Sequence, residues 1–260
     1  MTLPTGCTLA YDDLGTGCPL VLLHAFPLDR TMWQPQHPLS DRCRLLAVDL
    51  PGFGDSPTAP FTIDGVADAI ATWMAELRIT PAVVGGLSMG GYVALALARR
   101  HPDKLRGLIL ADTRAGADDP ATQNQRNQSI ALVTQKGTAA LFAGLLPKIL
   151  SDRTCAEKPQ LVEHLKAMAA RQPAAAVAAA LAALRDRPDA TPGLAAIAVP
   201  TLVLVGEHDA ITPPLIAANL AAQIRTSRLV HIPGAGHLAN VENPDAFNAA
   251  LRSFLGELTG

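Results

Sequence analysis

The stretch PAVVGGLSMGGYVALALARRHP, residues 81–102, decides the fold. It begins with a short apolar run, turns through Gly86, Ser88 and Gly90, and continues as a pattern typical of a helix. A strand that turns this sharply into a helix strains the backbone of the serine and lifts its Oγ clear of the sheet. The residues two positions away on either side must then be very small, because larger side chains would collide. The pattern G-x-S-x-G therefore predicts a strand, a tight turn with an exposed serine, and a helix.

Short, continuous apolar runs alternate with longer helical patterns along the rest of the chain. Runs without polar alternation are typical of strands buried on both faces, as in a parallel sheet. Apolar residues that recur every three or four positions predict helices with one buried face. The predicted strands cover residues 19–25, 44–50, 82–86, 105–112, 200–206 and 228–234, and the predicted helices include 63–77, 212–224 and 243–258. This order predicts an α/β fold with a mostly parallel, doubly wound sheet, and the stretch 8–23 predicts a hairpin leading into it.

One long segment, residues 114–192, carries helical patterns and no strand-like run. It lies between two predicted strands of the sheet, so we interpret it as a helical cap over one end of the sheet. The core would then comprise residues 1–113 and 193–260. The stretch LFAGLLPKIL, residues 141–150, would give the cap an aliphatic wall.

Composition limits the classes of function. A chain of 260 residues, 49% hydrophobic and 17% charged, can bury a sizeable core without disulfides or metal. The net charge of -2 gives no electrostatic reason to expect nucleic acid or an anionic membrane as a partner. The alanine-rich stretch 174–184 is too short for a membrane span, and the N-terminal sequence lacks the pattern of a signal peptide. We therefore expect a cytoplasmic protein whose four cysteines, Cys7, Cys18, Cys43 and Cys155, are free thiols and hold no metal.

A serine becomes a useful nucleophile only beside a base, and the base needs an acid to orient it. Ser88 lies at the carboxyl end of a predicted strand, where sheets of this kind place their ligand sites. His237 lies at the same end, in a glycine-rich loop after the last strand-like run. His24, also at a strand end, and His208, beside a candidate acid, are the alternative bases.

The acid has three candidates. Asp209 lies in the loop after the strand at residues 200–206, and Glu207 is its near competitor. Asp112 also lies at the carboxyl end of a strand. The chain order Ser88, Asp209, His237 matches nucleophile, acid and base, so we favour Asp209.

Acyl transfer also needs two N–H groups aimed at the developing oxyanion. We expect one from the backbone of Met89, directly after the serine, and the other from Phe26, in the loop after the first apolar strand. Pro27 cannot donate and restricts Phe26 to extended geometry. The substrate pocket is predicted to include Phe26, Leu145 and Leu238.

Five motifs resemble those of the α/β-hydrolase superfamily, in the same order and across nearly the full chain. They are LLHAFPLD for the oxyanion loop, DLPGFGDS for the loop after the next strand, GLSMGG for the nucleophile, VGEHDAITPP for the acid and GAGHLANVENP for the histidine. The chain is most similar to small carboxylesterases, cofactor-free haloperoxidases or perhydrolases, and 3-oxoadipate enol-lactonases. One departure is Ala25, since the family usually has glycine after this histidine, and it predicts a slightly different oxyanion loop.

The resemblance implies a serine hydrolase of carboxylic esters with small to medium, largely apolar groups. The resemblance implies no cofactor. It implies lactonase or perhydrolase activity as a side reaction of the esterase site. We expect a monomer or small homo-oligomer. Enol-lactone hydrolysis is an alternative that needs a cation in the cap for a carboxylate substrate. Slow or non-catalytic ligand binding is a second alternative. The candidate cations are Arg114, Arg126, Lys136, Lys148 and Arg171.

Overall fold

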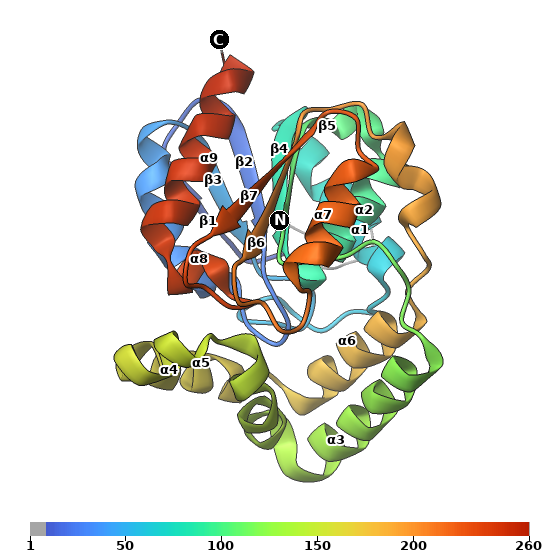
Figure 1. Ribbon diagram of the computed structural model, residues 1–260. Coiled ribbons are helices and arrows are strands. Elements are labelled where there is room, and N and C mark those ends of the chain that lie inside the picture. The colour runs from blue at the N-terminus through green and yellow to red at the C-terminus, as the bar shows by residue number, and fades with distance from the viewer. Residues whose placement is uncertain (1–8, 260) are drawn as a thin grey trace.

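The computed structural model describes residues 9–259 of the chain (Figure 1). In this part of the chain a seven-stranded sheet has the order β1-β3-β2-β4-β5-β6-β7. β1 pairs antiparallel with β3, and the other neighbouring strands are parallel. The strands are β1 (Tyr11–Leu14), β2 (Pro19–Leu23), β3 (Arg44–Val48), β4 (Ala82–Leu87), β5 (Leu105–Ala111), β6 (Thr201–Gly206) and β7 (Ser227–Ile232). The expected α/β fold with a mostly parallel sheet is confirmed.

Helices cover both faces of the sheet (Figure 1). α1, α2 and α7 pack on one face, and α9 with the 3-10 helix Arg30–Asp41 packs on the other. Asn243 caps the start of α9, because the Ala246 N–H donates to Asn243 Oδ1. The α-helices are α1 (Ile63–Glu76), α2 (Met89–Arg100), α3 (Pro120–Ile149), α4 (Asp152–Glu157), α5 (Pro159–Ala170), α6 (Ala174–Asp186), α7 (Pro214–Ala222), α8 (Ala239–Glu242) and α9 (Pro244–Thr259).

The strands read as unbroken apolar runs because both of their faces are buried. In β2, Leu20 and Leu22 pack in one core, whereas Val21 and Leu23 pack in the core on the opposite face of the sheet. Successive side chains of a strand point to opposite faces, so a central strand needs apolar residues at every position.

The predicted hairpin at residues 8–23 is wrong. β1 does not pair with β2, although only four residues separate them, and it pairs with β3 instead. Both edges of β2 are already taken, by β3 on one side and β4 on the other, so the free edge of β3 is the place left for β1. The expected lack of a signal peptide stays a prediction, because most of the N-terminal stretch that it concerns lies outside the described residues.

Residues 114–192 contain α3 to α6 and lie below the sheet in Figure 1, on the side where the parallel strands end. We name this stretch the helical segment. Among the described residues, α3 is long and apolar enough to cross a membrane, and the bent pair α5–α6 would be a second candidate if it formed one broken span. The pair is bent by 94°, and α3 breaks at Gly137, which has φ 80°. Helices of this kind are weak evidence for a membrane protein.

Candidate active site

Ser88 lies at the turn between β4 and α2, with φ 53° and ψ -110°. This left-handed backbone costs a non-glycine residue of order 1–3 kcal/mol. A Cβ on Gly86 would overlap the backbone of Gly90, and a Cβ on Gly90 would overlap the carbonyl oxygen of Leu23. The glycines are therefore required by close backbone approach, as the sequence pattern predicts. The strained turn is held on both sides, because the Ser88 N–H donates to Ala111 O and the Ser88 carbonyl accepts from the side chain of residue 113.

The structure brings Ser88, His237 and Asp209 together in one hydrogen-bonded chain. His237 Nε2 lies 2.9 Å from Ser88 Oγ, and His237 Nδ1 lies 2.8 Å from Asp209 Oδ2. Asp209 and His237 are buried, whereas Ser88 is half-buried. With Nδ1–H donating to the carboxylate, Nε2 carries the lone pair that can accept the serine proton.

Asp209 is fixed by more than the histidine. Its Oδ1 accepts the N–H groups of Ile211 and Thr212 at 2.8 and 2.9 Å, and its Oδ2 accepts the Thr212 hydroxyl at 2.6 Å. Burial alone would raise the pKa of Asp209, but the charge of His237 and the hydrogen bonds from His237 and Thr212 hold this pKa below its ordinary value. The carboxyl therefore stays ionised and oriented. Sequence reasoning missed Thr212, whose only signal is a hydroxyl three residues after the acid.

The competing acids lie in other environments. Asp112 is fully buried after β5, with φ 46°, and its two oxygens accept the N–H groups of Gly206 and Ala239. Burial, reinforced by the charge of Asp209, raises the pKa of Asp112 well above its ordinary value. Glu207 is exposed and accepts a backbone N–H from residue 234. The geometry therefore favours Asp209 as the partner of the histidine.

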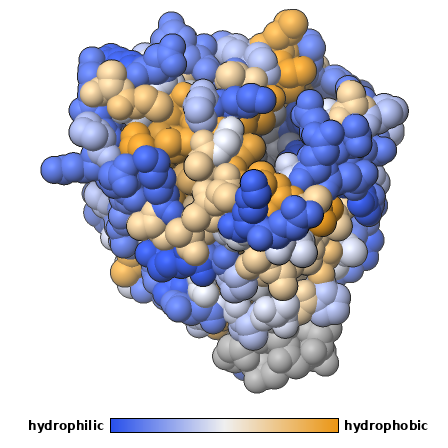
Figure 2. All heavy atoms as spheres, turned by 90° about the horizontal axis from the view of Figure 1, so that it is seen from below, coloured by the Kyte–Doolittle hydropathy of each residue, from blue (hydrophilic) through white to orange (hydrophobic). Residues whose placement is uncertain are grey.

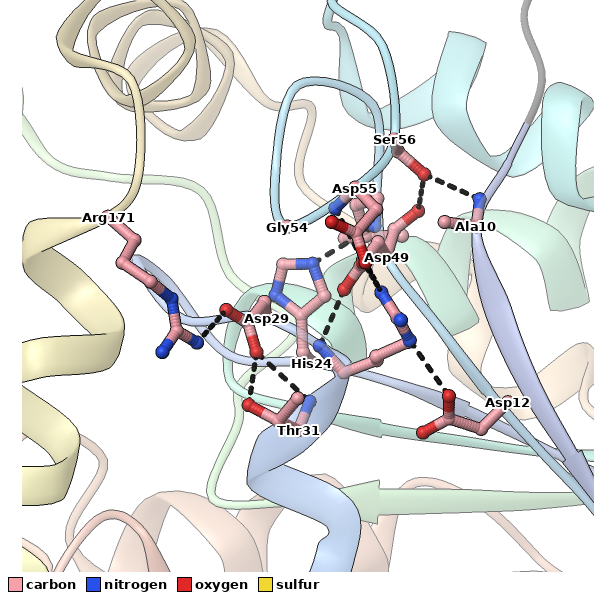
Figure 3. Close-up of polar contacts among 12 residues, drawn as sticks. Ala10, Asp12, His24, Asp29, Thr31, Asp49, Gly54, Asp55, Ser56 and Arg171 are labelled. Atoms are coloured by element: carbon pink, nitrogen blue, oxygen red, sulfur yellow. Dashed lines mark hydrogen bonds and ion pairs between the residues drawn. The ribbon is translucent and has the colours of Figure 1, made fainter.

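The alternative bases lie elsewhere in the fold. His24 is completely buried near Asp49 (Figure 3). Its Nδ1–H donates to the Ala25 carbonyl, and its Nε2 accepts the Leu50 N–H. Burial lowers the pKa of His24, against the raising effect of the nearby Asp49. His208 is exposed, with its Nε2 3.9 Å from a carboxylate oxygen of the adjacent residue 207. Ala25 has no positive φ, so alanine fits this position of the loop without left-handed strain.

The two expected oxyanion donors, Met89 and Phe26, follow the carboxyl ends of the neighbouring strands β4 and β2. Met89 is the first residue of α2, so its N–H has no acceptor within the helix. Phe26 lies in the loop after β2, its peptide bond to Pro27 is cis, and its half-buried ring packs against the core. Leu145 is half-buried in α3, whereas Leu238 is almost completely buried in the core, so their contact with substrate stays a prediction.

Three of the five candidate cations are already paired with carboxylates. Arg114 and Arg126 lie 3.0 and 3.1 Å from the buried carboxylate of Asp118. Arg171 lies 2.9 Å from Asp29, at the contact between the helical segment and the core shown in Figure 3. The remaining two are the exposed Lys136 and Lys148 of α3. Of the five candidate cations, only these two lysines are left, within the described part of the chain, without a carboxylate partner for a charged substrate.

Comparisons with known proteins agree with the fold. The sequence profile described as "Alpha/beta hydrolase family" matches residues 20–250. A pimeloyl-acyl-carrier protein methyl ester esterase of Neisseria meningitidis serogroup C is 35% identical over 256 residues, which cover 90% of this chain and 92% of the relative. The 3-oxoadipate enol-lactonase 2 of Acinetobacter baylyi is 28% identical over 239 residues, covering 91% and 88%.

A solved structure gives the same result. The thermophilic esterase from Thermogutta terrifontis, determined with malate bound, superimposes with a TM-score of 0.95 at 40% identity and covers 99% of this chain and 97% of its own. Esterase and lactonase relatives of this similarity support hydrolase activity for the present chain. The chain belongs to the Alpha/beta hydrolase family.

Proposed function

We propose that this protein is a serine hydrolase of carboxylic esters that works through an acyl-enzyme. The observation that carries the proposal is the continuous chain from Ser88 Oγ through His237 to Asp209, with links of 2.9 and 2.8 Å. These contacts are short enough for direct proton transfer from the serine to the imidazole. The esterase relatives support the same class of reaction.

The proposed mechanism has two halves. Ser88 Oγ attacks the ester carbonyl carbon while its proton passes to His237 Nε2, and Asp209 stabilises the imidazolium. The N–H groups of Phe26 and Met89 bind the oxyanion of the tetrahedral intermediate. His237 then gives its proton to the departing alcohol, which leaves the acyl group on Ser88. Water enters, His237 takes a proton from it, and the carboxylic acid is released as Ser88 regains its proton.

The substrates proposed are small to medium esters with largely apolar acyl or alcohol groups. The helical segment, residues 114–192, would act as the cap that sizes the pocket, with Phe26, Leu145 and Leu238 as its apolar lining. On the side of the molecule that carries this segment, apolar surface gathers between hydrophilic side chains (Figure 2). We further propose a cytoplasmic monomer or small homo-oligomer that needs no cofactor.

Hydrolysis of an anionic enol-lactone is a second candidate, supported by the 28% identical enol-lactonase. It requires a cation that is free to bind a carboxylate, and Arg114, Arg126 and Arg171 are each held by an aspartate of the fold. Only the exposed Lys136 and Lys148 of the five candidates are left for such a substrate, so these pairings favour neutral esters. A slow ligand-binding protein is the third candidate, and turnover far below one per second on every ester would favour it.

The test is hydrolysis of p-nitrophenyl esters from acetate to octanoate by the wild type, Ser88→Ala and Ser253→Ala. Ser253 is an exposed serine of α9, so its variant is a matched control for the loss of one hydroxyl. We expect Ser88→Ala to lose the activity and Ser253→Ala to keep it, with a chain-length optimum that sizes the pocket. Wild-type turnover that survives Ser88→Ala would overturn the proposal.

A further inference from the structure

Three consecutive backbone N–H groups, those of residues 236–238, each donate a hydrogen bond and so fix the loop that carries His237. The N–H groups of Gly236 and Leu238, on either side of the histidine, both donate to Glu242 Oε1, at 2.9 and 3.2 Å. The N–H of His237 itself donates to the carbonyl oxygen of Ile149, at 2.8 Å. One carboxylate oxygen thus fixes the peptide groups before and after the proposed base. Glu242 is only 4% exposed, so solvent does not replace these bonds.

The second oxygen of the same carboxylate reaches the helical segment. Glu242 Oε2 accepts the N–H of Ser151, at 2.9 Å, where the chain passes from α3 to α4. The Ser151 hydroxyl donates to the Gly234 carbonyl at 3.0 Å, at the start of the histidine loop. A Cβ on Gly236 would lie 2.7 Å from Ser151 N, so the two backbones are in close contact. Glu242 therefore joins the helical segment to the loop of the proposed base.

We propose that Glu242 is a positioning residue for His237, and that it couples the helical segment to the orientation of this base. The inference rests on the proposed role of His237 in catalysis. A carboxylate has two oxygens and no N–H, so it can accept from the histidine loop and from Ser151 at the same time. A side chain with one acceptor cannot hold both partners.

The Glu242→Gln variant removes one of these acceptors while keeping the shape of the side chain. Its single amide oxygen can serve either the histidine loop or Ser151, and its NH2 group must face the other N–H. Two donors that face each other in a buried site are unfavourable. The link between the helical segment and the histidine loop is thus broken whichever way the amide turns.

A second pair of variants cuts the link from the other end. Ser151 has φ -66° and the residue before it is extended, so proline fits this backbone. The proline ring carbon replaces the N–H hydrogen, so the bond is lost and Glu242 Oε2 must move away. Ser151→Ala keeps this N–H and loses only the hydroxyl. The difference between Ser151→Pro and Ser151→Ala therefore measures the loss of the N–H bond together with the displacement of the Glu242 carboxylate.

The first readout is the rate at which diethyl p-nitrophenyl phosphate inactivates the enzyme. In this step the Ser88 Oγ–P bond forms, p-nitrophenolate leaves, and the serine proton passes to His237. The second readout is the low-field proton NMR signal of His237 Nδ1–H, identified by its loss in His237→Ala. A contribution that was only to stability would leave this signal and the inactivation rate unchanged in the folded protein.

We expect Glu242→Gln to slow inactivation roughly 10- to 100-fold, the range for misplacement of a catalytic group by a fraction of an ångström to 1 Å. Ser151→Pro should be slowed similarly relative to Ser151→Ala, and the double variant Glu242→Gln/Ser151→Pro should be no slower than the slower single variant. The Nδ1–H signal should broaden or shift in both. KM for a p-nitrophenyl ester should change less than kcat.

Inactivation rates within twofold of their references, with an unchanged Nδ1–H signal, would overturn the inference. If Glu242→Gln does not fold, the Ser151 pair still decides it. If the wild type neither hydrolyses esters nor reacts with the phosphate ester, the proposed function fails, and the NMR signal alone then decides whether Glu242 positions His237. The two failures are therefore distinguishable.

Discussion

Replacement of Asp209 by asparagine separates the orienting charge from the geometry of the site. The Ile211 and Thr212 N–H groups both donate to Oδ1, so the amide oxygen must occupy that position. The NH2 group then takes the place of Oδ2, 2.8 Å from His237 Nδ1, and donates to it. The imidazole must carry its own proton on Nε2, which faces Ser88 Oγ at 2.9 Å. It can no longer accept the proton of the serine.

The size of the effect follows from this change of tautomer. An enzyme locked in the wrong histidine tautomer loses on the order of 10⁴ in kcat, which corresponds to about 5.5 kcal/mol in the activation free energy. We expect a loss of this size for Asp209→Asn on the best p-nitrophenyl ester. The thermal unfolding temperature should change little, because the side chain keeps its shape and its backbone bonds.

Two further aspartates provide the comparison. Asp245→Asn changes an exposed carboxylate in the first turn of α9 and should leave the activity unchanged. Asp112→Asn alters the buried competitor, which accepts only backbone N–H groups, and should cost at least 100-fold less than Asp209→Asn. The reasoning is refuted if Asp209→Asn keeps its activity within tenfold of wild type while Asp112→Asn loses it.

Two other features predict changes that equilibrium urea unfolding can measure. Gly90→Ala should lower the free energy of unfolding by about 3 kcal/mol, because its Cβ overlaps the Leu23 carbonyl oxygen. Gly144→Ala in α3 meets nothing within 4 Å and should raise it by about 0.5–1 kcal/mol. Arg171→Ala should lower it by about 1 kcal/mol at pH 7, discounted because the guanidinium is half-exposed. This last difference should shrink below about pH 4, as Asp29 becomes protonated.

The sign of the pH effect follows from Asp29. Burial raises the pKa of this carboxyl, but hydrogen bonds from Thr31 and Arg171 outweigh burial and hold the pKa below its ordinary value. Such a group stabilises the fold above its unfolded pKa, and this contribution is lost as the pH falls through the folded value. A difference between Arg171→Ala and wild type that is as large at pH 3 as at pH 7 would contradict the pairing. Equal stabilities of Gly90→Ala and Gly144→Ala would contradict the packing argument.

Local patterns in the sequence predict most of the sheet, because parallel strands buried on both faces leave an unmistakable apolar run. The same patterns fail for β1, since its pairing depends on which strand edges other parts of the chain have already occupied. The 3-10 helix Arg30–Asp41 was not predicted either. It contains Pro35 and Pro38 and lacks the apolar period of an α-helix.

In the candidate site too, local sequence motifs predict some residues and miss the long-range contacts. Ser88 and His237 follow from glycine-rich turns at strand ends, a signal confined to a few neighbouring residues. The bond between Glu242 and Ser151 joins residues 91 positions apart. No period or motif encodes such a contact, because it depends on how the helical segment lies against the histidine loop.

The position of the helical segment in the chain has a consequence for protein engineering. Ser88 precedes the segment, whereas Asp209 and His237 follow it, and the serine and the histidine are 149 positions apart. A cut within the segment would therefore give two fragments, one with the nucleophile and the other with the base and acid. With the roles proposed here, neither fragment hydrolyses an ester alone, and colour from a p-nitrophenyl ester appears only when the two reassemble. Fused to two interacting proteins, the fragments would form a complementation reporter with a very low background.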